Sequence, residues 1–160
     1  YPEKAPESVG NFVSLANGRF YDGLTFHRII SGFMIQGGDP NGDGTGGPGY
    51  RFANEYPTDQ YPPDDPAANR PIVYPRGTLA MARTMDPHSA TAQFFINHKD
   101  NPPLDYPSRD GWGYAVFGKV TEGMDVVDKI AEVRTGNNGM HQNVPRTPVV
   151  IENVKILSEK

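Results

Sequence analysis

The stretch that decides the fold is Phe26-His27-Arg28-Ile29-Ile30-Ser31-Gly32-Phe33-Met34-Ile35-Gln36-Gly37-Gly38-Asp39. It predicts two short apolar strands joined by a turn at Ser31-Gly32. Alternation with a period of two puts Arg28 on the same strand face as Leu24, Phe26 and Ile30. A guanidinium among such neighbours needs a partner, because an unpaired buried charge is very costly. Either another part of the chain or a ligand supplies that partner.

Length and composition favour a single β-rich domain with many turns. The chain has 160 residues, of which 36% are hydrophobic and 11% aromatic, enough for an aromatic-rich core. Glycine and proline together make up about a fifth of the chain, which favours short elements over long helices. The net charge is −4 without a basic block, so nucleic-acid binding is not indicated. The absence of cysteine excludes disulfides and thiol chemistry.

Two helices are expected from the spacing of apolar residues. The first begins at Pro6, which suits the first helical position, and ends at Gly18. The second runs from about Met124 to Val133, with Val127, Ile130 and Ala131 on one face. Strands are expected at residues 24–30, 33–36, 78–82, 93–97, 114–120 and 149–157. Residues 40 to 76 are expected to form a loop that is functional or held by side-chain contacts.

Several familiar kinds of site do not fit the sequence. Residues 39–44 match the start of a calcium-binding loop, but the twelfth position, which needs a glutamate, is Tyr50. The glycines of residues 42–49 are not followed by the lysine of a phosphate loop. The four histidines lack ligand spacing, so we expect no metal, and His27 is interpreted as a hydrogen-bonded structural histidine. No serine lies in a nucleophile elbow.

What remains is Arg28 together with apolar side chains and two amides. The apolar set, drawn from separate strands and one loop, is Phe33, Met34, Phe95 and Leu104. Gln36 and Gln93 lie inside apolar strands, where a polar amide needs hydrogen-bond partners. This combination fits a pocket that binds a small apolar ring and hydrogen-bonds an adjacent peptide. A plain core is nearly as good an interpretation of these residues.

Six motifs in order make the sequence resemble a known family. They are Phe26-His27-Arg28-Ile29-Ile30, Gly32-Phe33-Met34-Ile35-Gln36-Gly37-Gly38-Asp39, Gly44-Thr45-Gly46-Gly47, Ala80-Met81-Ala82-Arg83, Gln93-Phe94-Phe95-Ile96-Asn97 and Val116-Phe117-Gly118-Lys119-Val120. Together they resemble the cyclophilins, which are peptidyl-prolyl cis–trans isomerases. Residues 82–84, 89–93, 111–114 and 139–142 are most similar to the bacterial cytoplasmic type. The resemblance therefore favours the cytoplasm, with the periplasm left open.

The resemblance implies a fold, an activity and a set of site residues. The fold would be a closed, eight-stranded antiparallel barrel capped by two α-helices, with the active site on its outer face. Arg28 would be the catalytic residue, and no cofactor or metal would be needed. The substrate-binding residues would be Phe33, Met34, Gln36, Ala82, Arg83, Gln93, Phe95, Leu104 and Tyr114. The partners would be proline-containing peptides and folding polypeptides, and the protein would be a monomer that assists folding.

The sequence also departs from the family pattern. The opening strand hairpin of the family has no counterpart before the first helix, so residues 1–160 are expected to form one domain that is N-terminally incomplete. Pro103 lies near a position that carries tryptophan in many relatives, so cyclosporin binding is expected to be weak. Tyr114 stands where many eukaryotic relatives have histidine.

Two other functions remain open on sequence grounds. One is a proline-peptide-binding module whose isomerase activity is incidental. The other is a structural β domain without a site, in which an internal carboxylate pairs with Arg28.

Overall fold

The computed structural model describes residues 1–3, 5–53, 76–86, 88–101, 104 and 114–158. Within them the chain is mainly β, with two helices. The elements are, in order, α1 (Pro6–Asn17), β1 (Arg28–Ile30), β2 (Met34–Gly37), β3 (Thr78–Met81), β4 (Phe94–Asn97), β5 (Val116–Lys119), α2 (Met124–Ala131), β6 (Thr135–Asn138) and β7 (His141–Pro145). None of the helices in this part of the chain is long and apolar enough to cross a membrane.

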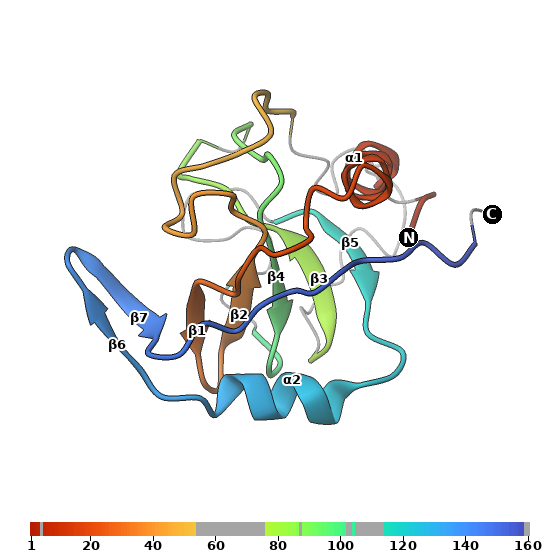
Figure 1. The fold of residues 1–160 in the computed structure, drawn as a ribbon. Helices are drawn as coiled ribbons and strands as arrows, with labels where there is room; N and C mark the ends of the chain where they lie inside the picture. Colours follow the sequence, from red (N-terminus) through yellow and green to blue (C-terminus); the bar gives the residue numbers. More distant parts are fainter. Residues whose placement is uncertain (4, 54–75, 87, 102–103, 105–113, 159–160) are drawn as a thin grey trace.

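Five of the strands form one antiparallel sheet in the order β1-β2-β4-β3-β5. The hairpin of β6 and β7 is a separate two-stranded ribbon that stands beside β1 (Figure 1). α2 lies along one end of the sheet, and α1 lies near the opposite end (Figure 1). The described strands therefore form an open sheet with a side ribbon, and the closed eight-stranded barrel is not seen among them.

Side chains alternate between the two faces of this sheet. On the inner face, Ile29 and Ile35 are 1% and 0% exposed and pack against Val127 and Ala131 of α2. The outer face carries its own smaller apolar cluster around Met34, Ala80 and Phe95. Because each face is covered differently, a shift of one residue in strand register would exchange the two sets of side chains. The hydrophobic pattern thus fixes which residues face outward.

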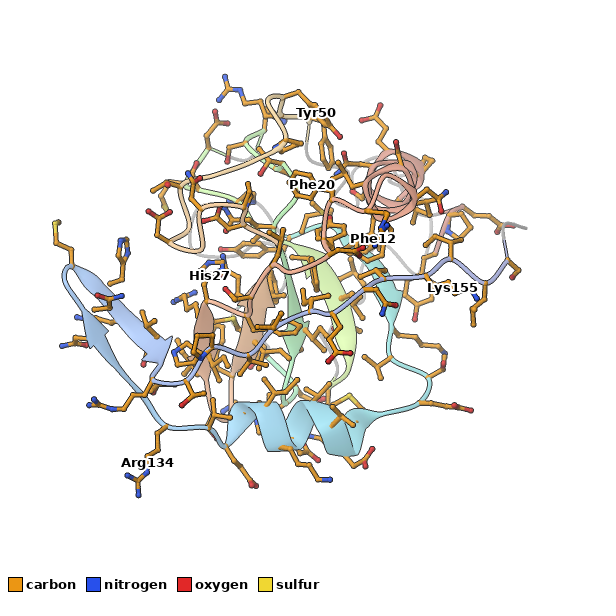
Figure 2. All side chains as sticks on the ribbon, in the orientation of Figure 1. Phe12, Phe20, His27, Tyr50, Arg134 and Lys155 are labelled. Carbon is orange, nitrogen blue, oxygen red and sulfur yellow. The ribbon has the colours of Figure 1, made fainter. Side chains whose placement is uncertain are left out.

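An aromatic cluster joins α1 to the inner face. Phe12 of α1 packs against Phe94 of β4, edge to face, with ring centroids 5.6 Å apart. Its ring also lies 5.1 Å from that of Tyr21, whose hydroxyl donates to the Ala92 carbonyl at 2.9 Å. Figure 2 shows Phe12 at the inner side of α1, close to the sheet. Tyr21 is 0% exposed, and full burial of an aromatic ring of this size stabilises a fold by about 1.5–3 kcal/mol.

The two predicted helices are confirmed, with one corrected boundary. α1 has Pro6 in its first turn and Gly18 at its C-terminal cap, as its sequence predicts. α2 ends at Ala131, whereas the sequence predicts an end near Val133. The reason is local: the Val133 N–H donates to the carbonyl of Ile130, three residues back, at 3.3 Å. The chain after Ala131 therefore forms a tighter turn with a hydrogen bond to the third residue back, and the α-helix does not continue to Val133.

The first predicted strand is shorter than expected, and this changes the face on which its residues lie. β1 begins at Arg28 and not at Leu24, because residues 23–26 hydrogen-bond to the C-terminal segment instead of β2. The Phe26 N–H, for example, donates to the Val149 carbonyl at 3.0 Å. Leu24 and Phe26 consequently pack in the inner core, while Ile30 packs in the outer cluster. The prediction that all three share a face with Arg28 is wrong.

The C-terminal prediction is also corrected. Residues 149–157 form no strand, and their only bridge among the described residues joins Val150 to Thr25. This segment crosses in front of the sheet in an extended path (Figure 1). Its core-facing residues are Ile151, Val154 and Ile156, a spacing that breaks strict period-two alternation. The segment is thus held by packing and a few hydrogen bonds, without a continuous ladder.

The hairpin of β6 and β7 was not predicted. Its strands are largely polar and exposed, so they lack the apolar alternation that indicates a strand. Asn138 pairs with His141 across a two-residue turn that starts at Gly139, whose φ is +61°. Such turns favour glycine at this position. Of the loop predicted at residues 40–76, residues 40–53 hold no helix or strand, and residues 54–75 lie outside the described part.

Candidate active site

The strand register lines up one row of residues across the outer face. Arg28 of β1 pairs with Gln36 of β2, which pairs with Phe95 of β4. Phe95 in turn pairs with Ala80 of β3, which pairs with Val116 of β5. Polar side chains occupy one end of this row and apolar ones the other. The sheet itself therefore places a cation next to an apolar surface.

An apolar pocket of about 180 Å³ lies over this row. Nine of the ten site residues predicted from the sequence line it; they are Arg28, Phe33, Met34, Gln36, Ala82, Arg83, Phe95, Leu104 and Tyr114. The tenth, Gln93, does not line the pocket and is 8% exposed. The volume suits one small ring, and the mixture of apolar walls with a few polar groups is typical of a ligand site.

The pocket walls are held by packing and by backbone contacts. Met34 and Phe95, 1% and 5% exposed, form the base, and Tyr114 meets Phe95 edge to face at 5.6 Å. The guanidinium of Arg83 stacks over Tyr114, 4.3 Å from the ring centroid. On the opposite side, the Phe33 carbonyl accepts from Asn101 Nδ2 at 2.8 Å. These contacts pre-form the cavity before any ligand enters.

Arg28 begins a chain of hydrogen bonds that runs from the pocket into the loop behind it. Its Nη1 donates to Gln36 Oε1 at 3.3 Å, and Gln36 Nε2 donates to Gln93 Oε1 at 3.2 Å. Gln93 Nε2 then donates to the carbonyls of Gly44 and Gly46, at 3.0 and 3.1 Å. We call these residues the amide relay. Both glutamines thus have the partners that their burial requires, as predicted.

The loop at the end of the relay is held by a buried carboxylate. Asp39 is 1% exposed and accepts from the N–H groups of Asn41 and Asp43, each at 2.9 Å, and also from that of Gly44. Residues 39–44 thus form a set of turns around Asp39, and the carbonyls of Gly44 and Gly46 are presented to Gln93. The glycine-rich segment therefore supports the site from behind.

Arg28 is exposed and pairs with no carboxylate among the described residues. The sequence predicted a partner for a guanidinium placed among apolar residues; Gln36 accepts a hydrogen bond from it, and the guanidinium is exposed where the pattern had suggested burial. Because the guanidinium faces solvent at the pocket rim, Gln36 can orient it without neutralising it. A purely structural domain was expected to pair Arg28 with an internal carboxylate. No such ion pair is present in the described part of the chain.

His27 lies behind the site and differs from its prediction. It is 7% exposed, and its Nδ1 is buried without a hydrogen-bond partner among the described residues, so the prediction of a hydrogen-bonded histidine is wrong at this atom. Burial lowers the pKa of His27, and this effect exceeds the opposing one of the Asp39 carboxylate. Figure 2 shows His27 at the end of β1 that faces the glycine-rich loop.

Two further hollows adjoin the apolar pocket. One, of about 170 Å³, is bordered by three predicted substrate-binding residues, Ala82, Arg83 and Gln93, together with Thr84, Ser89 and Thr91. The other, of about 460 Å³, lies between the glycine-rich loop and the β6–β7 hairpin. Sequence reasoning missed the second one, because the hairpin that walls it carries no apolar signal.

Comparison with known proteins decides the family. The family model described as "Cyclophilin type peptidyl-prolyl cis-trans isomerase/CLD" matches residues 1–156. The chain belongs to the cyclophilins. It is 48% identical over 158 residues to peptidyl-prolyl cis-trans isomerase B of Escherichia coli K12, covering 98% of this chain and 90% of the relative. It is 50% identical over 156 residues to a peptidyl-prolyl cis-trans isomerase of Streptomyces antibioticus, covering 96% and 87%.

Solved structures agree with this assignment. The cyclophilin-type isomerase of Cryptosporidium parvum, crystallised in the presence of the dipeptide Ala-Pro, superimposes with a TM-score of 0.78 at 29% identity, covering 99% of this chain and 90% of that one. The predicted family and activity are thus confirmed: this cyclophilin is a peptidyl-prolyl cis–trans isomerase (EC 5.2.1.8). The prediction about cyclosporin rests on Pro103, which lies outside the described residues.

Proposed function

We propose that this cyclophilin binds the ring of a prolyl residue in the apolar pocket, and that Arg28 catalyses rotation about the peptide bond before it. One observation supports this most strongly. Nine residues from five separate stretches of sequence converge on one pocket, and Arg28 stands at its rim with a guanidinium that no described carboxylate neutralises. A cation held beside an apolar cavity suits a ligand that is apolar at one end and hydrogen-bonding at the other.

The chemistry needs only a positioned donor. Rotation about an X–Pro bond has a barrier of about 18–20 kcal/mol, because the amide loses its resonance when it twists. In the twisted state the prolyl nitrogen becomes pyramidal and gains a lone pair. A guanidinium N–H aimed at that nitrogen binds the transition state more strongly than the planar amide, which accelerates the rotation. Arginine suits this role because it stays protonated at every relevant pH.

The other pocket residues hold the two halves of the substrate. Phe33, Met34, Phe95, Leu104 and Tyr114 grip the proline ring so that the preceding acyl group rotates. Gln36 binds the substrate backbone: its Oε1 retains a second lone pair and its Nε2 a second N–H beyond the relay bonds. Ala82 and Arg83 border the path of the extended peptide. Gln93 donates to the loop and accepts from Gln36, and it borders the same hollow as Ala82 and Arg83, where it would contact the extended peptide.

The physiological substrates that we propose are X–Pro bonds in unfolded or flexible segments of folding polypeptides. In such segments about 10–30% of X–Pro bonds are cis, and their exchange is slow enough to limit folding. We propose that the protein acts as a monomer in the cytoplasm, on its resemblance to the bacterial cytoplasmic type, and that it binds cyclosporin weakly. Cell fractionation, sedimentation and a cyclosporin titration test these three points separately.

For the fold, we propose that the chain forms one isomerase domain and that its sheet is part of the closed eight-stranded barrel of the family. The extended C-terminal segment supports this, since it runs across the sheet and hydrogen-bonds to residues 23–26. A crystal structure in which the five-stranded sheet stays open at both edges would overturn the barrel.

The decisive experiment is NMR exchange spectroscopy on a short Ala-Pro peptide with catalytic amounts of protein. We expect fast cis–trans exchange with the native chain and a loss of about 10²- to 10³-fold in Arg28→Ala, the usual effect of removing one such donor. Arg51→Ala is the matched control, because Arg51 is also exposed and its one ion pair within the described part of the chain is a surface contact with Asp86. Peptide binding without accelerated exchange in the native chain would favour a binding module. Native-like exchange in Arg28→Ala would refute the catalytic assignment.

A further inference from the structure

A second cavity continues from the apolar pocket and has no role in the rotation step. We call it the side groove. It is lined by His27, Arg28, Gln36, Gly42, Asp43, Gly44, Arg83 and residues Asn138 and Met140–Val144 of the hairpin. Arg28, Gln36 and Arg83 also line the apolar pocket, so the two cavities meet at these three side chains. A peptide held at the proline would lie at the entrance of the side groove.

The size of the side groove suits more than one residue. Its volume is about 460 Å³, against about 180 Å³ for the pocket that takes a single ring. One wall is the glycine-rich loop at Gly42–Gly44, and the other is the β6–β7 hairpin. At the tip of the hairpin, Met140 is 96% exposed, which leaves an apolar side chain at the edge of a polar groove. A polypeptide has a polar backbone and apolar side chains, so it can contact both the polar groove and Met140.

The hairpin turns a defined set of side chains toward the groove. Asn138 of β6 lines it and also borders a second hollow at the hairpin, whereas the preceding Asn137 borders only that second hollow. On β7, Gln142 and Asn143 add two more amides. Amides both donate and accept, so they can bind the backbone of a peptide of any sequence.

The formal charges that line the groove are unequal. Two guanidinium groups, those of Arg28 and Arg83, face one carboxylate, that of Asp43. Asp43 Oδ1 already accepts from the N–H of Thr45 at 2.9 Å and from its hydroxyl. That carboxylate is therefore partly satisfied within its own loop. An incoming carboxylate would meet more attraction than an incoming ammonium group.

We propose that the segment adjoining the proline of the substrate lies in the side groove against the β6–β7 hairpin, and that an acidic residue in this segment is favoured over a basic one. The inference rests on the proposed function, because it assumes that the proline ring occupies the apolar pocket. It adds the hairpin as a determinant of substrate preference, separate from the residues that act on the X–Pro bond.

The test compares short and long substrates. The probes are a capped Ala-Pro dipeptide and octapeptides with Ala-Pro at their centre and Glu, Gln or Lys at neighbouring positions on either side. The variants are Gln142→Ala in the groove and Asn137→Ala as the matched control, an amide on the same hairpin that does not line the groove. The measured quantity is kcat/KM by exchange spectroscopy for each octapeptide, divided by that for the dipeptide. Backbone amide shifts of residues 138–144 are followed during the same titrations.

We expect this ratio to fall several-fold in Gln142→Ala and to stay native in Asn137→Ala. The Glu octapeptide should exceed the Lys octapeptide by about two- to fivefold, as for other exposed charge pairs, and the difference should shrink in high salt. The hairpin amides should shift with octapeptides and not with the dipeptide. Equal ratios in all three proteins, unshifted hairpin amides, or a preference for Lys would overturn the proposal. If the native chain does not accelerate exchange in the dipeptide, the proposed function fails and this inference falls with it.

Discussion

Nη1 of Arg28 donates to Oε1 of Gln36 at 3.3 Å, and the same two residues are directly opposite each other in the register of β1 and β2. The position of the guanidinium is therefore set by two features of one strand pair: the backbone ladder and a side-chain hydrogen bond. Because a misplacement of about 1 Å can cost about 10²-fold in rate, such double control matters for a group that acts by position alone.

Gln36→Ala removes the acceptor that orients Arg28, so we expect kcat to fall about tenfold or more with little loss of folding stability. Gln93→Ala should have a smaller effect on kcat and should also cost about 1 kcal/mol of stability, since Gly44 and Gly46 lose their donor. Exchange spectroscopy and urea unfolding measure the two quantities. If the relay acts as a unit, the effects of the two substitutions on kcat are not additive. Full additivity would show that Gln93 does not act through Gln36.

Gly46→Ala tests the loop that supports the relay. An added Cβ at this position would meet the carboxylate of Asp39 and also the side chain of Asn41, at 3.0 Å. The loop must shift, so we expect reduced kcat and lower stability. Gly10→Ala is the control, because Gly10 lies within α1 with nothing within 4 Å of an added Cβ. That change should stabilise the protein by about 0.5–1 kcal/mol without altering turnover. Native turnover in Gly46→Ala would show that the conformation of this loop does not affect catalysis.

His27 predicts a pH dependence of stability. Burial lowers its pKa in the folded state below the ordinary value of about 6.5. The unfolded chain therefore binds the proton more readily, so the contribution of neutral His27 is complete above about pH 6.5 and is lost as pH falls below it. We expect urea unfolding at a series of pH values from about 8 to about 5 to show that the free energy of unfolding of the native chain declines as the pH falls. The decline should be smaller in His27→Gln. Substitution of the exposed His88 is the control, and an unchanged decline in His27→Gln would contradict the prediction.

Asp128 of α2 connects the helix to the end of the sheet near the β1–β2 turn. It accepts from Arg76 Nη2 at 2.7 Å and from His98 Nε2 at 2.9 Å, while the Gly32 N–H donates to His98 Nδ1 at 2.8 Å. The hydrogen bond from Arg76 is the main reason that the pKa of Asp128 is lowered. Its stabilisation is thus present above the unfolded carboxyl pKa of about 3.9 and is lost as pH falls through the folded value.

We therefore expect Asp128→Asn to lower the urea midpoint at neutral pH and to flatten its decline in acid. Asp125→Asn, on the same helix but outside this set of hydrogen bonds, is the control for loss of a charge. If the urea midpoint of Asp128→Asn declines in acid as steeply as that of the native chain, Asp128 is not the group responsible for the loss of stability in acid.

The sequence predicted the elements whose signals are local. α1 carries proline at its start and glycine at its end, and the strands around Ile35, Ala80 and Phe95 are short apolar runs. It failed where long-range pairing decides the structure. Residues 24–26 were predicted as part of a strand, but the Leu24 carbonyl and the Phe26 N–H hydrogen-bond to the C-terminal segment, which no local pattern indicates.

The same limit applies to the site. Residue patterns and motif resemblance together named the ten residues, and the register of β1, β2 and β4 explains why Arg28, Met34, Gln36 and Phe95 share a face. The hairpin of β6 and β7 escaped prediction because Asn137, Asn138, Gln142 and Asn143 have no hydrophobic period. Gln93 was predicted as a substrate-binding residue; it borders the adjoining hollow beside Ala82 and Arg83, and its hydrogen bonds go to Gln36 and to the loop. The sequence does not show which of two neighbouring hollows a given side chain lines.

The hairpin has a consequence for how this enzyme can change over evolution or by design. It is a ribbon outside the main sheet, closed by a two-residue turn at Gly139 and Met140. Among the described residues, no ladder hydrogen bond joins this hairpin to the strands that carry Arg28 and Gln36. Insertions, shortened turns or grafted sequences at its tip could therefore accumulate while Arg28 stays in place. Mutations in the hairpin would then change substrate selectivity, and mutations in the amide relay would change the rate, largely independently of each other.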